Sequence, residues 1–139
     1  MIGIGTNVLV RYLTQDDPEQ SAVANKFFQS VLSTTRRGFV SLVVLAEVCW
    51  VLQASYEVSD GELVALVENL LHTPQLILED RDCVSEALQS MALARTSIAG
   101  FVDFLIRAIA TSKGCEYCVT FDKKSSRSTG MKLMTSDVG

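Results

Sequence analysis

The chain begins with MIGIGTNVLVRYL, residues 1–13, and this segment decides the fold class. A short apolar run ends at Gly5, and Thr6-Asn7 then supplies a helix-start signal before apolar residues at helical spacing. The segment therefore predicts a strand, a turn and a helix in that order, which is the repeating unit of α/β proteins.

The same alternation continues along the chain. We expect strands at residues 1–5, 38–41, 76–78, 117–121 and 131–134, and helices that begin near residues 6, 18, 42, 59, 80 and 101. The helix from residue 80 is expected to run to Arg95, and residues 122–130 are expected to form a polar loop. The second helix is expected to turn one apolar face inward, made of Ala22, Val23, Phe27, Phe28, Val31 and Leu32. This pattern predicts an α/β fold with a parallel sheet and helices on both faces, in a single domain over residues 1–139.

Composition limits the classes of function. The chain has 139 residues, 48% of them hydrophobic, which is enough for one core. Its net charge of −4 has the wrong sign for a broad basic surface, so any contact with RNA must be local and helped by metal cations or a partner. Charged residues interrupt the longest apolar stretches, and the N-terminus resembles no signal peptide, so we expect a cytoplasmic protein without a membrane helix.

The four cysteines (Cys49, Cys83, Cys115 and Cys118) favour burial over metal binding or disulfides. A reducing compartment disfavours disulfides, and a free cysteine behaves as a small apolar residue. Cys115 and Cys118 form a C-x-x-C pair, but a structural zinc site would need a second pair, and His72 is far away in sequence. We therefore expect core or strand cysteines.

Three carboxylates fall inside apolar segments, where an ionised acid is costly unless it is paired or binds a cation. Glu47 is the only charge in residues 42–52, which read as a fully buried helix; alternatively it lies at the helix edge, paired with Lys or Arg. Asp103 lies in the first turn of a helix, where the helix dipole alone can favour an acid. Asp122 follows a strand, where α/β sheets place their ligand crevice, although such residues often only form turns. If the three converge, a divalent cation would be needed to offset their repulsion.

Four segments, in order, resemble the motifs of VapC-type PIN domains. Residues 2–13 are similar to the family's opening, in which an Asp followed by Thr-Asn ends the first strand. Residues 41–52 are similar to the second motif, in which Glu47 matches a metal ligand, and FVDFLI at 101–106 matches the third. VTFDKK at 119–124 matches the fourth. The resemblance covers nearly the whole chain.

The resemblance implies a Rossmann-like, three-layer fold with a central parallel sheet of about five strands. It also implies a metal-dependent endoribonuclease toxin that uses Mg²⁺ or Mn²⁺, is inhibited by a cognate antitoxin and forms a homodimer. By this resemblance Glu47, Asp103 and Asp122 are the catalytic metal ligands. Thr6, Asn7 and Thr120 are supporting residues that orient ligands or water.

The chain departs from the family pattern at Gly5, where the family has a metal-binding Asp. Asn7 is a poor substitute, because its amide carries no charge and it lies in a helix start. Loss of one carboxylate should lower cation affinity and catalysis together, so we expect an impaired or inactive copy. The chain has either kept the fold for binding alone, or lost the Asp because an active toxin harms its host. We favour the second explanation, since the other three motifs are intact.

Two other functions remain open from the sequence. The chain can be an interaction module that dimerises and captures an antitoxin segment, independent of any chemistry. It can also use Gly3 to Asn7 as a phosphate-binding turn of a nucleotide-binding domain. The nucleotide-binding signal is weak, because the third glycine and the downstream acid of that motif are absent.

Overall fold

The computed structural model describes residues 1–94 and 100–135. The chain divides into two compact units, Met1–Arg81 and Asp82–Gly139, and each is described by itself. The expected single domain over residues 1–139 stays a prediction.

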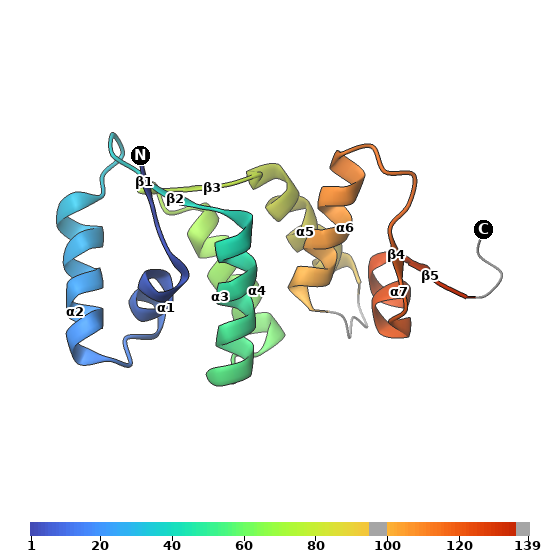
Figure 1. The fold of residues 1–139 in the computed structure, drawn as a ribbon, viewed down its shortest axis with the longest axis horizontal. Coiled ribbons are helices and arrows are strands. Elements are labelled where there is room, and N and C mark those ends of the chain that lie inside the picture. Colours follow the sequence, from blue (N-terminus) through green and yellow to red (C-terminus); the bar gives the residue numbers. More distant parts are fainter. Residues whose placement is uncertain (95–99, 136–139) are drawn as a thin grey trace. The chain divides into compact units, whose positions relative to one another are not determined.

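A parallel three-stranded sheet organises the first unit. Its strands are β1 (Ile2–Gly3), β2 (Gly38–Val40) and β3 (Leu76–Leu78), in the order β1-β2-β3. Gly38 pairs with Ile2 on one side and with Leu76 on the other. Each connection runs through two successive helices, as parallel strands require a crossover (Figure 1). The predicted strands are confirmed, although β1 is shorter than the apolar run that predicted it.

Local capping signals set most helix starts in the first unit. The helices are α1 (Thr6–Thr14), α2 (Pro18–Lys26), α3 (Leu42–Ser55) and α4 (Asp60–Leu71), with a π-helical turn η1 (Phe27–Val31) continuing α2. Asp17 and Ser41 accept backbone N–H groups at the starts of α2 and α3. Ser59 and Glu62 form a complete capping box at the start of α4, as the sequence predicted.

The inward face of α2 and η1 differs in part from the expected one. Phe28 and Leu32 are buried as expected, but Ser21 and Ala24 are buried too, whereas Val23 is 71% exposed and Val31 lies at the surface. The hydroxyl of Ser21 donates to the carbonyl oxygen of Arg11, which makes its burial tolerable. Contact with α1 therefore selects a face one residue away from the one that apolar content alone predicted.

The second unit contains a parallel two-stranded sheet. Its elements are α5 (Arg81–Leu93), α6 (Phe101–Ser112), β4 (Val119–Thr120), α7 (Lys123–Thr129) and β5 (Lys132–Leu133), with β4 beside β5. Arg95, the expected end of α5, lies outside the described residues. The expectation of a polar loop at residues 122–130 is wrong, because Asp122 caps the short helix α7 there and Gly130 ends it with a positive φ of 82°.

The cysteines divide into two groups. Cys49 and Cys83 are buried, as expected, and burial raises the pKa of the Cys49 thiol to about 12. Cys118 is half-buried, just before β4, but Cys115 is exposed in the turn after α6, which corrects its expected burial.

Parallel strands alternating with helices confirm the α/β class. In residues 1–94 and 100–135, no helix combines the length and the apolar character needed to cross a membrane.

Candidate metal centre

Glu47 lies on the exposed face of α3, and its carboxylate accepts a hydrogen bond from the first residue of α1. The hydroxyl of Thr6 donates to Oε1 of Glu47 at 2.8 Å. Val43 and Trp50, which share this face at helical spacing, are 71% and 70% exposed. The expectation that α3 is fully buried is therefore wrong. Glu47 lies at the exposed side of the helix, as the alternative predicted, but no Lys or Arg among the described residues forms an ion pair with it.

Gly5 is the N-cap residue of α1, directly before Thr6. Its φ of −81° and ψ of 161° are ordinary extended values, and it provides no side-chain cap. A Cβ atom added at Gly5 would meet nothing within 4 Å. The position therefore accepts a side chain without strain, and Asp is among the favoured residues at such a cap.

The carboxyl ends of β1, β2 and β3 lead to Gly5, Ser41 and Glu79. Oε1 of Glu79 accepts the backbone N–H of Leu42 at 2.8 Å, at the start of α3. Glu79 is not among the predicted site residues, although it follows a predicted strand directly, which is the same signal that singled out Asp122. Because its carboxylate is used as a helix cap, Glu79 has a local structural role.

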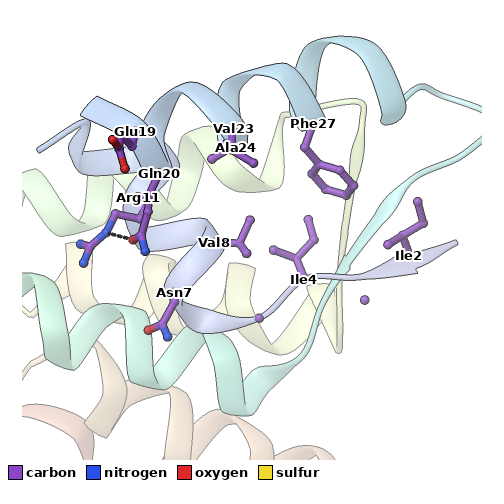
Figure 2. A pocket seen from close by; sticks show the side chains of 12 residues that line it. Ile2, Ile4, Asn7, Val8, Arg11, Glu19, Gln20, Val23, Ala24 and Phe27 are labelled. Carbon is purple, nitrogen blue, oxygen red and sulfur yellow. Dashed lines mark hydrogen bonds between the residues drawn. The ribbon is translucent and has the colours of Figure 1, made fainter. Parts of the chain in front are cut away.

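A cavity of about 650 Å³ opens beside Gly5. Figure 2 shows Ile4, Val8 and Phe27 directed into the space between α2 and the segment from β1 to α1. Its polar side chains include Arg11, whose guanidinium donates to Oε1 of Gln20 at 2.7 Å. Asn7 also lines the cavity, is exposed, and has no side-chain hydrogen bond among residues 1–94 and 100–135. The cavity is lined mostly by apolar side chains, and its polar residues Arg11, Glu19 and Gln20 lie together near the start of α2.

Asp103 lies in the first turn of α6 and is half-buried. Its backbone N–H donates to the carbonyl oxygen of Gly100. In the described part of the chain, no hydrogen bond or ion pair reaches its carboxylate, not even from Arg107 one turn further along α6. Among the described residues, proximity to the start of the helix is thus the local feature that stabilises this carboxylate.

Asp122 is held by its immediate neighbours. Its carboxylate accepts the backbone N–H groups of Lys124 and Ser125, at 2.8 and 3.3 Å, and so caps α7. The hydroxyl of Thr120 accepts the backbone N–H of Asp122 at 3.0 Å. Thr120 therefore sets the direction in which the chain leaves β4 and presents Asp122.

Glu47, Asp103 and Asp122 share one electrostatic property, which is that none of them forms a salt bridge among the described residues. The single salt bridge among the described residues joins Arg11 to Asp16, so none of the three is neutralised by Lys or Arg. Glu47 belongs to the first unit, and Asp103 and Asp122 belong to the second. Over the described ranges, no group of three His, Cys, Asp or Glu side chains within one unit is arranged to hold a metal ion.

Comparison with known families gives a match over residues 4–130 to the PIN domain. The chain belongs to the PIN domain family. PIN domains are generally metal-dependent nucleases, so a nuclease-type function follows, and it takes precedence over a nucleotide-binding domain built on Gly3 and Gly5. No curated protein and no solved structure shows a significant match to this PIN domain.

Proposed function

We propose that this PIN domain is an endoribonuclease toxin of the VapC type, acting in the cytoplasm, neutralised by a cognate antitoxin and impaired by Gly5. The observation that carries the proposal is the state of Glu47, Asp103 and Asp122. All three lie in segments that resemble motifs of the family, and none is in an ion pair within the described residues. Carboxylates left without a cation partner suit a site that acquires its positive charge from a metal.

The chemistry of the donor set fits Mg²⁺ or Mn²⁺. Both are hard cations that prefer oxygen ligands, and carboxylates supply such oxygens with compensating charge. Among the described residues, one carboxylate oxygen of Glu47 accepts no hydrogen bond. Neither carboxylate oxygen of Asp103 accepts a hydrogen bond from those residues. We propose these two residues and Asp122 as the metal ligands and catalytic residues.

The metal, when bound, would activate a water molecule and stabilise the negative charge that develops at the scissile phosphate. The residues of the chain would fix the geometry. The hydrogen bond from the Thr6 hydroxyl restricts the rotamers of Glu47. The hydrogen bond from the backbone N–H of Asp122 to the Thr120 hydroxyl holds the backbone that carries the Asp122 carboxylate. Asn7, exposed near Gly5, is free to hydrogen-bond water or a phosphate oxygen.

Gly5 explains why this copy should be impaired. Thr6, the next residue, contacts Glu47 directly, and consecutive Cα atoms are only about 3.8 Å apart. A carboxylate at position 5 would therefore belong to the same neighbourhood as Glu47, and glycine leaves that neighbourhood one ligand and one negative charge short.

The test is Gly5→Asp, compared with Gly5→Asn. Both side chains fit the open position and both are good N-caps, so their effects on folding should match. Only the Asp variant adds a charged ligand. We expect cleavage of RNA with Mg²⁺ or Mn²⁺ to rise at least about tenfold in Gly5→Asp and to stay unchanged in Gly5→Asn.

Cleavage is measured as the initial rate on labelled single-stranded RNA, with chelator as the blank. Adding Glu47→Gln to the Gly5→Asp variant should remove the gain. If Gly5→Asp remains inert with both metals, the nuclease proposal is wrong.

A second candidate function is a catalytically dead PIN module that only dimerises and binds an antitoxin. The missing ligand at Gly5 favours it, as does the largely apolar cavity beside that residue. This module predicts tight binding of the antitoxin encoded beside the chain, with the same affinity in Gly5→Asp and no cleavage by either. Light scattering should show twice the 15.2 kDa mass of one chain, under either function.

A further inference from the structure

One face of α7 carries three cationic side chains. Ser125 and Thr129 are buried, whereas Lys123, Lys124 and Arg127 are exposed. At about 100° per residue, the three cations point away from the buried pair, and Arg127 is a helical neighbour of both lysines. We call Lys123, Lys124 and Arg127 the α7 basic face.

The α7 basic face has no acidic partner among the described residues, because the one salt bridge there lies in the first unit. Two other cations of the second unit, Lys132 and Arg107, are engaged in contacts. The ammonium group of Lys132 lies 4.5 Å from the ring centroid of Tyr117, and the guanidinium of Arg107 packs beneath Gly130. Like charges one helical turn apart destabilise a helix slightly, so α7 bears a cost that a bound anion would remove.

The positive charge is concentrated in this part of an acidic chain. Residues 119–135 hold four of the twelve Lys and Arg residues but only one of the sixteen Asp and Glu residues. That one acid is Asp122, whose carboxylate caps α7 and so fixes the basic face close to a proposed metal ligand. If a metal ion joined one phosphate of a polyanion to Asp122, the neighbouring phosphates would lie beside these cations.

We propose that the α7 basic face binds backbone phosphates of the RNA strand that flanks the cleavage site. This inference rests on the proposed function for its choice of RNA as the polyanion. Lysines act as point charges and Arg127 can form paired hydrogen bonds with one phosphate, so the contacts position the strand without reading its sequence. A chain with net charge −4 thereby gains a local surface for a nucleic acid.

The experiment measures binding of fluorescein-labelled oligouridine by anisotropy, with chelator present so that neither metal nor cleavage contributes. The triple variant Lys123→Gln, Lys124→Gln and Arg127→Gln removes the charges but keeps good helix formers. With about 0.7 counterions released per contact on single strands, the slope of log K against log salt should fall by about 2. At 0.1 M salt this corresponds to a loss of affinity of about a hundredfold.

The matched control is Lys26→Gln, Arg36→Gln and Arg37→Gln, which removes three exposed cations from the first unit. It should leave both slope and affinity unchanged. A charge-conserving variant, Lys123→Arg, Lys124→Arg and Arg127→Lys, should also keep the slope. Circular dichroism that matches the unmodified chain verifies that each variant is folded.

Two results overturn the inference: equal salt slopes in the α7 and control variants, or no RNA binding by the unmodified chain. Its failure is separable from that of the nuclease proposal. If Gly5→Asp cleaves RNA while the α7 variant binds normally, only the basic face is wrong. If Gly5→Asp is inert while the α7 variant binds weakly, the basic face remains as an RNA contact and the nuclease proposal fails.

Discussion

Asp16, between α1 and α2, joins α1 to the end of α3 through a small set of polar contacts. The Tyr56 hydroxyl, at the end of α3, donates to one carboxylate oxygen, and the Thr14 hydroxyl donates to the other at 2.8 Å. Arg11 on α1 reaches both Asp16 and the Tyr56 oxygen. The hydrogen bond from Tyr56, followed by that from Thr14, holds the pKa of Asp16 below its usual value of 3.8.

Tyr56→Phe should raise the pKa of Asp16, because the hydrogen bond that favours its charged form is lost. A depressed folded-state pKa adds stability above the unfolded value of about 3.9, and this is lost as pH falls through the folded value. The stability difference between the unmodified chain and Tyr56→Phe should thus be largest near neutral pH and shrink in acid. Carbon-13 NMR titration of the Asp16 carboxyl checks the shift, and an unchanged pKa would contradict the assigned cause.

At the scale of the element, α7 depends on Asp122 in two ways. The carboxylate accepts two backbone N–H groups as the N-cap, and its charge is proposed to bind metal. The two roles can be separated, because Asn caps a helix as well as Asp does but brings no charge.

Asp122→Ala should lower the free energy of unfolding by about 1 kcal/mol, whereas Asp122→Asn should leave it nearly unchanged. Both substitutions should lower metal-dependent cleavage in the Gly5→Asp background. Urea denaturation measures the first effect and initial cleavage rates the second. Equal destabilisation by the two substitutions would show that the cap does not stabilise α7.

For the whole molecule, metal binding and stability should be linked. A ligand that binds only the folded chain stabilises it by about 2.7 kcal/mol at a hundred times its dissociation constant, which raises the melting temperature by several degrees. Mn²⁺ should therefore raise the melting temperature of Gly5→Asp more than that of the unmodified chain.

Differential scanning fluorimetry with a Mn²⁺ series measures this shift, and chelator should reverse it. Gly5→Asn is the control for the cap, and Gly5→Asp combined with Glu47→Gln is the control for the site. A shift of the same size in all four proteins would place the bound metal elsewhere.

Sequence signals predicted the elements best where the deciding interaction is local. The caps at Ser41 and Ser59 lie within three residues of the N–H groups that they bind, so the sequence shows both partners together. The polar composition of residues 122–130 favours a loop, but the carboxylate of Asp122 caps a short helix there. The exposure of side chains was harder to predict. Ser21 is buried and Val23 is exposed because Ser21 lies on the side of α2 that contacts α1.

By itself the sequence determined the order of strands and helices, and it predicted Glu47, Asp103 and Asp122 as metal ligands and Gly5 as a position that lacks one. Only the tertiary structure decided that Thr6 donates to Glu47, 41 positions further along the chain, and that α3 turns this residue outward. It also decided that α7 exposes three cations without an ion-pair partner among the described residues. The physical reason is range. Capping and periodicity depend on residues a few positions apart, so the sequence shows them directly. Packing between distant segments selects which face of each helix is buried, and the sequence does not show it.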